Sequence, residues 1–453
     1  MMKGLKLINQ IKERDLSAYF DKLFKIPRSI TGKGFRKSLK ILGDIIDLNL
    51  IKIKSNTKVL DWTVPDEWNI NDAYILDPKG KKILDFKKNN LHVLNYSEPV
   101  NKIVSLEELK KNIFTLKKMK KAIPYVTSYY SRRWGFCMEY EKLVKLKKGN
   151  YKVFIDSSFN KNGHLVYNDS LLVGKTKKEI LLSTYLCHPQ MANNELSGPL
   201  LLANLYKILK ETGPHKYSYR FVICPENIGA AAFLSKNKNT IKNKVIGGFV
   251  INCVANGSKF TLKKSRQANS LADRAALNVL KNSNFKKVDV VDYFPDGSDE
   301  RQYCSPGFNL PIALVMRNMF HYFDGKKQKN KDFPEYHTSL DNKKIFSFKT
   351  LKESLKVYYE ILMTIENNFI PNAKVKFGTP QLSKSRIPLY PKIMDFRNNE
   401  KTKTTRLILE MLNLSEGKTD LIDICNMKNF KLIDYLDTFE KLLKSGYIKK
   451  IDK

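Results

Sequence analysis

Four clusters of polar residues in this sequence carry side chains that could do chemistry together. His188 follows the apolar run 179–186, and Glu226 follows the apolar run 219–224. The third cluster is the charged stretch 296–301, and the fourth contains His337. Two histidines, a glutamate and nearby carboxylates are the usual components of a metal-assisted hydrolase. The residue types therefore indicate a metal site whose ligands come from separated segments, without a compact two-histidine motif on one helix.

Each residue type would have its own task in such a site. Histidine binds Zn²⁺ through a neutral ring nitrogen, and its other N–H needs an orienting carboxylate. Asp341, four residues after His337, could supply that carboxylate. Glu226 could accept a proton from a water activated by the metal. The alternative for His188 is a simple capping contact at the end of a strand, since such loops often hold ordinary contacts.

The segments around these residues alternate between strand-like and helix-like patterns. Repeated alternation of this kind is typical of an α/β fold, a mainly parallel sheet flanked by helices on both faces. In open α/β sheets, ligands bind just outside the carboxyl ends of the strands. His188 and Glu226 are both expected at such ends. The expected strands are 151–155, 170–173, 179–186, 219–224, 247–254, 288–293 and 312–315.

Shifts in composition divide the chain into four parts. Residues 1–50 and 150–370 are expected to form the α/β domain, and residues 51–149 a small β-rich insertion. Residues 371–399 are predicted to be a linker. Residues 400–453 hold three short helical runs and a final β-like run, a pattern typical of a winged helix. We expect this module to contact a protein rather than DNA, because a fold does not fix a function.

Composition excludes several other classes. The 453 residues carry a formal charge of +36, but the lysines are spread over nearly every segment, so we expect no nucleic-acid binding by the main body. The six cysteines are scattered without a paired motif, which is typical of reduced thiols. No membrane span or signal peptide is evident, so we expect a cytoplasmic location and no membrane partner. The sequence does not determine whether the protein forms a homo-oligomer.

Several stretches of the chain resemble the bacterial aminopeptidase-like domain proteins that are often named together with polysaccharide biosynthesis. These proteins are similar, more distantly, to zinc-dependent exopeptidases. The resemblance implies a zinc-exopeptidase-like α/β domain with a β-rich insertion and a C-terminal winged helix. The stretches are LFKIPRSITGKGFR, VPDEWNINDAYI, NNLHVLNYSEPV, STYLCHPQMANNELSGP, CPENIGAAAFL, DGSDERQYCSPGFNLP and PEYHTSLDN.

The resemblance also implies roles for single residues. His188 matches the first zinc-binding histidine of the peptidases, and His337 matches the last, with Asp341 as its orienting carboxylate. Glu226 matches the general base. Asn194 falls where an aspartate that bridges two metals is expected.

The neighbouring residues Asp299, Glu300 and Arg301 are expected to bind the charged end of the substrate. Ser298-Asp299 matches a serine–aspartate pair near the active site of the peptidases. The alternative is a structural ion-pair cluster, because such networks also gather charged residues.

Three positions depart from the peptidase pattern. Asn194, Asn227 and Asn252 stand where the peptidases have carboxylate ligands. An amide oxygen lacks a full negative charge, so we expect one zinc ion rather than two. Its ligands would be His188, His337 and a third group, for which Asn194, Asp299 and Glu300 are the candidates.

These features lead to two hypotheses about function. The first is a zinc-dependent aminopeptidase-like hydrolase of a small amide or peptide, with a link to surface polysaccharide biosynthesis. The alternative is a degenerate peptidase fold that binds a metabolite or a partner without turnover.

Overall fold

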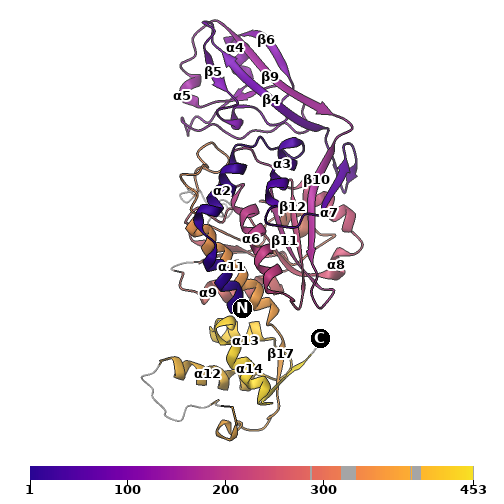
Figure 1. Ribbon diagram of the computed structural model, residues 1–453, viewed down its shortest axis with the longest axis vertical. Coiled ribbons are helices and arrows are strands. Elements are labelled where there is room, and N and C mark those ends of the chain that lie inside the picture. The colour runs from indigo at the N-terminus through magenta and orange to yellow at the C-terminus, as the bar shows by residue number, and fades with distance from the viewer. Residues whose placement is uncertain (286–287, 318–332, 388, 390–398, 452–453) are drawn as a thin grey trace.

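An eight-stranded sheet forms the centre of the computed structural model, which describes residues 1–285, 288–317, 333–387, 389 and 399–451 (Figure 1). The four central strands run parallel, and antiparallel pairings are added toward both edges. The expected α/β fold is therefore confirmed, with a mixed sheet. In spatial order the strands are β1 (Leu50–Lys54), β10 (His164–Leu172), β12 (Ser218–Cys224), β11 (Glu179–Tyr185), β13 (Val245–Val250), β16 (Ile312–Arg317), β14 (Phe260–Lys263) and β15 (Val288–Val291).

Helices cover this sheet, and its central strands are buried along nearly their whole length. All seven residues of β11 are buried, as expected for a parallel strand covered on both faces. The connections from β11 to β12 and from β12 to β13 cross in opposite directions, so right-handed crossovers put their helices on opposite faces. These two helices are α6 (Ser197–Thr212) and α7 (Ile228–Asn237).

The helices on the α6 side form a layer of their own. Helix α6 packs against four other helices of this layer, α1, α2, α3 and α11, and α11 in turn packs against α9. The layer consists of α1 (Met2–Gln10), α2 (Glu13–Phe24), α3 (Lys33–Leu42), α6, α9 (Leu271–Lys281) and α11 (Phe348–Glu366). None of the described helices is both long enough and apolar enough to cross a membrane.

The inserted module lies at one end of the molecule and has its own four-stranded sheet (Figure 1). Its order is β5 (Lys82–Asp85), β4 (Glu67–Leu76), β9 (Asn150–Asn160) and β6 (Val100–Ser105). The boundaries of this module differ from the expected ones at both its start and its end. Strand β1 pairs with β10 in the main sheet, whereas the strand expected at 151–155 is part of β9 in the module. Alternation predicts a strand but not its partner, which explains the difference.

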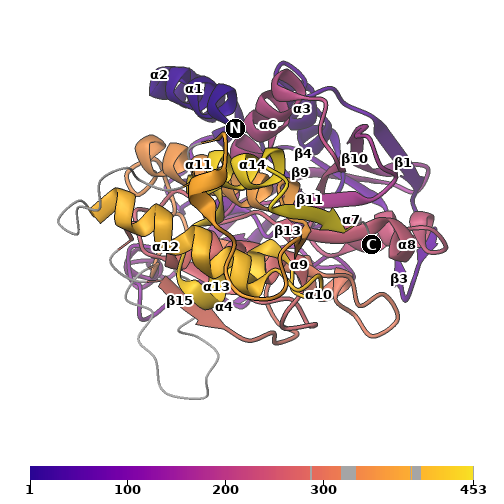
Figure 2. The same ribbon diagram turned by 90° about the horizontal axis from the view of Figure 1, so that it is seen from below.

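The C-terminal part lies at the opposite end of the molecule (Figures 1 and 2). It contains α12 (Asn399–Leu414), α13 (Leu421–Lys428), α14 (Leu436–Lys444) and β18 (Ile448–Ile451). Strand β18 pairs antiparallel with β17 (Ile370–Ala373), which occupies the start of the expected linker. Residues 388 and 390–398 of that linker lie outside the described residues. The winged-helix assignment stays a prediction.

Candidate active site

His188 and Glu226 lie side by side at the carboxyl ends of two neighbouring strands. Strands β11 and β12 are parallel, and Tyr185 at the end of one is in register with Cys224 at the end of the other. The chains that continue from these positions therefore emerge together at one edge of the sheet. His188 Nε2 is 3.5 Å from Glu226 Oε2. The predicted strand-end site is thus formed by adjacent strands.

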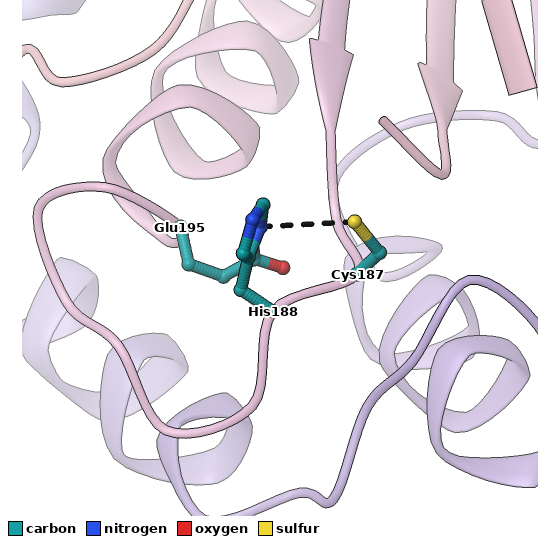
Figure 3. Close-up of side chains that lie close together, drawn as sticks. All are labelled: Cys187, His188 and Glu195. Atoms are coloured by element: carbon teal, nitrogen blue, oxygen red, sulfur yellow. Dashed lines mark hydrogen bonds and ion pairs between the residues drawn. The ribbon is translucent and has the colours of Figure 1, made fainter. Parts of the chain in front are cut away.

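The other ring nitrogen of His188 is held by a residue that the sequence did not single out. Nδ1 of His188 lies 2.8 Å from Oε2 of Glu195, in the loop before α6 (Figure 3). Arg28 Nε is 3.3 Å from Glu195 Oε1, and it also donates to the backbone oxygen of His188 at 3.1 Å. All three side chains are buried. Glu195 therefore supplies the orienting carboxylate and leaves Nε2 facing Glu226.

His337 lies beside this pair, as the sequence predicted. Its ring centre is 5.2 Å from that of His188, and the Tyr336 ring stacks on it at 3.8 Å. His337 Nε2 is buried and makes no hydrogen bond within the described residues. Burial lowers the pKa of His337 well below its usual range, and His188 lowers it further. The imidazole is therefore neutral, which is the form that binds a metal.

The charges around His188 favour a cation at this place. Burial lowers the pKa of His188, but Cys187 and Glu195 raise it, and the result lies well above the usual range. Burial also raises the pKa of Glu226, and His188 acts in the opposite direction. A positive charge between Glu195 and Glu226 is thus stabilised, whether it is a proton on the imidazole or a bound metal ion.

Asp341 was predicted to orient His337, but it hydrogen-bonds to a different partner. The Asp341 carboxylate accepts hydrogen bonds from the backbone amides of Asn193 at 2.7 Å and Asn194 at 2.9 Å. It therefore fixes the loop that precedes α6 instead of orienting His337. Burial raises the pKa of Asp341, and the backbone hydrogen bonds from this loop partly offset that effect, so that the pKa is about 7.

The stretch Asp299–Arg301 also differs from expectation. Glu300 accepts a hydrogen bond from Lys263 at 2.7 Å in a fully buried ion pair. Asp299 accepts one from the amide of Asn227 at 2.5 Å, and Arg301 Nε donates to Asn227 Oδ1 at 2.6 Å. Both carboxylates are thus engaged within the protein. Asp299 and Glu300 thus make the contacts expected of the structural alternative, and Arg301 contacts Asn227, the residue after Glu226. The substrate-binding role stays a prediction.

Asn227 occupies a strained turn directly after Glu226. Its φ of 61° and ψ of −65° place it at the centre of a three-residue γ-turn, closed by a 2.7 Å hydrogen bond from the Ile228 amide to the Glu226 oxygen. Such turns with a positive central φ are rare and costly. The two contacts from Asp299 and Arg301 hold this turn, which ends β12 and begins α7.

Two sets of residues could hold one metal ion. Cys187, His188 and Glu195 offer ligand atoms within 4.8 Å of one another, through Nδ1 of the histidine. However, the 2.8 Å between Nδ1 and Glu195 is a hydrogen-bond distance, and Arg28 already compensates the carboxylate.

The second set lies on the other side of the His188 ring. There His188 Nε2 faces Glu226 at 3.5 Å, and the His337 ring, whose buried Nε2 has no partner among the described residues, has its centre 5.2 Å from that of His188. Asn194, the predicted third ligand, already accepts a hydrogen bond from Tyr185 at 2.8 Å through its side-chain oxygen. Two imidazoles and a carboxylate are ligand types that zinc accepts, whereas the amides do not suit a two-metal centre. Among the described residues, however, only the first set has three such ligand atoms within 4.8 Å of one another.

The comparisons with known proteins show the family and the fold of this chain. A family model described as a domain of unknown function, DUF4910, matches residues 17–368. The chain belongs to this family. It is also 42% identical over 410 residues, 89% of each chain, to a Clostridium acetobutylicum protein named as a polysaccharide biosynthesis protein with an aminopeptidase-like domain. The family resemblance seen in the sequence is thereby confirmed.

Solved structures show the same fold. A crystal structure described as a peptidase from Clostridium acetobutylicum superimposes with a TM-score of 0.85 at 36% identity, covering 99% of this chain and 98% of the other. A zinc aminopeptidase from Bacillus subtilis superimposes with a TM-score of 0.55 at 12% identity, covering 78% of this chain and 94% of the other. The second similarity establishes an aminopeptidase-like fold only.

Proposed function

We propose that this protein is a zinc-dependent hydrolase that cleaves the amide bond of a small substrate or peptide. The observation that carries the proposal is the proximity of three groups. The Glu226 carboxylate lies 3.5 Å from His188 Nε2, and the His337 ring, with its unpartnered Nε2, lies 5.2 Å from the His188 ring. The relative's name refers to polysaccharide biosynthesis. We propose a substrate from surface polysaccharide biosynthesis and a reaction in the cytoplasm.

In this proposal, the two histidines and Glu226 have different roles. His188 and His337 would hold the metal, and the chemistry that zinc supplies in such a site is Lewis acidity toward a carbonyl and toward water. Glu226 accepts a proton from the attacking water and passes it to the leaving amine. Burial raises the pKa of Glu226 toward the working pH, which suits a group that must both take and give a proton.

Tyrosine rings pack against the two imidazoles. Tyr125 and Tyr185 lie 4.9 and 5.1 Å from the His188 ring, and Tyr336 stacks on His337. Such rings exclude water and favour a substrate with an apolar or ring-shaped part next to the amide.

The second candidate function is binding without turnover. It is favoured by Asn194, Asn227 and Asn252, which stand where carboxylates would strengthen a metal site. Asn194 and Asn227 already make hydrogen bonds within the protein. A protein of this kind would bind a metabolite or a partner at the same site.

Metal content of the purified protein separates the two candidates. We expect about one zinc per chain by mass spectrometry, lost in a His188→Ala/His337→Ala double variant. The matched control is His164→Ala on β10, whose backbone rather than ring contacts Glu67. Absence of stoichiometric metal after zinc is added back would favour the binding protein.

Two further variants test the assignment of roles. Glu226→Gln should keep zinc and lower turnover of aminoacyl amides by about 10²- to 10⁴-fold, the range for a lost general base. Cys187→Ser should keep zinc as well, because the thiol lies on the Nδ1 side of His188. Loss of zinc in Cys187→Ser would instead assign the metal to the set with Glu195.

A further inference from the structure

The inserted module reaches the candidate site through one short segment. Its residues 123–125 run antiparallel to residues 337–339, with a bridge between Pro124 and Thr338. The Tyr125 amide donates to the His337 oxygen at 2.9 Å. The Ser339 amide donates to the Ile123 oxygen at 2.9 Å, and the Ile123 amide donates to Ser339 Oγ at 3.0 Å. The backbone of the second histidine is thus bound directly to the module.

The module also holds the loop that follows His188. The Asn90 amide donates to Gln190 Oε1 at 2.8 Å. Met191, fully buried, packs in one small cluster with three apolar side chains of the module. These side chains are Leu91, Ile123 and Cys137. Ile123 therefore contacts both histidine loops, by hydrogen bonds on one side and by packing on the other.

A side chain of the same segment lies next to the two imidazoles. The Tyr125 ring centre is 4.9 Å from that of His188 and 5.4 Å from that of His337. Its hydroxyl lies 2.7 Å from the hydroxyl of Tyr129, also in the module. The position of this ring is thus set within the module.

The loop after His188 and the loop that contains His337 both include a residue with a positive φ, which contacts with other segments must stabilise. Gln190 has a φ of 45° and His337 a φ of 56°, a region that side chains other than glycine rarely adopt. Such conformations persist only where surrounding contacts over-determine them. Asp341 joins the two loops from the side of the main domain, through the amides of Asn193 and Asn194. The module supplies the contacts on the other side.

We propose that the inserted module is a positioning element of the site: residues 90 and 123–125 fix the spacing of His188 and His337. The inference rests on the proposed function, because it concerns how these residues would hold a metal. Ile123 acts through the amide and the side-chain oxygen of Ser339, and the Asn90 amide acts through the side-chain oxygen of Gln190. Neither residue has a chemical role of its own.

The test removes the contacts singly and together without deleting the module. Ser339→Ala removes the acceptor of the Ile123 amide. Gln190→Asn shortens the acceptor of the Asn90 amide and keeps a residue that tolerates a positive φ. The matched control is Ser105→Ala, which removes a hydrogen bond to the Glu108 amide elsewhere in the module. Zinc affinity is measured by competition with a chelator.

We expect the double variant to bind zinc about tenfold more weakly, as is typical when supporting contacts of metal ligands are lost. Ser105→Ala should keep the affinity of the unaltered protein. Equal affinities in the double variant and the unaltered protein would overturn the inference, and so would an equal loss in the control.

A metal-free measurement keeps this outcome separate from that of the proposed function. Amide hydrogen exchange is followed in residues 186–192 and 335–341 of the same proteins without zinc. Faster exchange of both loops in the double variant, and not in the control, supports the inference. If the unaltered protein binds no zinc, the zinc hydrolase proposal fails. The exchange rates then decide the inference alone, and unchanged rates overturn it.

Discussion

A chain of buried charges fixes the candidate site at the level of single residues. Arg28 contacts Glu195, and Glu195 contacts His188. A buried carboxylate is tolerated only with a partner of opposite charge or several hydrogen bonds. The guanidinium supplies that partner from the loop between α2 and α3, far from His188 in sequence. The orientation of His188 therefore depends on a contact between two distant parts of the chain.

Asp299 gives a prediction about pH. Burial, together with the nearby charge of Glu226, raises the pKa of Asp299 to about 8, whereas an aspartate in the unfolded chain titrates near 3.9. Between these values the folded state binds more protons, so the free energy of unfolding falls as pH rises. Asp299→Asn removes this dependence and keeps an acceptor for the Asn227 amide.

The difference in unfolding free energy between Asp299→Asn and the unaltered protein should therefore shift in favour of the variant from pH 4 to pH 8. It should then stay level. Urea unfolding at a series of pH values measures it. A difference that does not change over this range would contradict the raised pKa of Asp299.

The sequence identified His188 and Glu226 because they follow apolar runs, and His337 because its segment resembles that of the last zinc-binding histidine of the peptidases. His188, Glu226 and His337 do lie together. The sequence did not single out Glu195, since a loop pattern does not show which of two neighbouring polar side chains turns inward. Asn194 was expected to face the site, whereas Glu195 contacts His188. An acidic residue shortly after a candidate ligand was the available signal.

At the level of elements, the strained turn between β12 and α7 determines where Glu226 lies. We predict that Asn227→Gly is more stable than Asn227→Ala by about 1–2 kcal/mol, because only glycine relieves the positive φ. Both variants lose the hydrogen bond to Arg301, so the comparison isolates the backbone. Chemical denaturation measures both values. Equal stability, or a more stable alanine variant, would argue against a strained turn.

The sheet shows which element-level features could be predicted. The apolar runs before His188 and Glu226 form strands β11 and β12, as predicted. Such runs could be predicted because a short, mostly apolar stretch is typical of a buried strand. The sheet to which β1 and β9 belong was not predictable. Both are amphipathic strands near the insertion, and their pairing depends on contacts with residues far along the chain.

At the level of the whole molecule, the C-terminal part is bound to the main domain by polar contacts from α9. Asn278, fully buried, donates to Asn426 and to the oxygen of Phe430, and it accepts from the Leu432 amide, each at 2.9 Å. Arg274 adds an ion pair with Asp420 at 2.7 Å. This part is therefore fixed to the body by specific contacts.

We predict that Asn278→Ala loosens the C-terminal part, because it leaves two backbone groups without partners at a cost of about 1–3 kcal/mol each. Limited proteolysis should cleave within residues 421–435 faster in this variant. The matched control is Asn282→Ala at the end of the same helix, whose side-chain amide donates to the backbone oxygen of Asn278. Cleavage at the same rate in both variants would contradict the prediction.

The pairing of β17 with β18 bears on how the protein can be divided into fragments. A fragment that ends at Ala373 keeps β17 and loses the strand that covers its hydrogen-bonding edge. An uncovered edge is a template for pairing with another molecule. Such a fragment is expected to self-associate even though all residues of the candidate site are present. A fragment that stops before Ile370 avoids the bare edge, although it still uncovers the face of α9 that the tail protects.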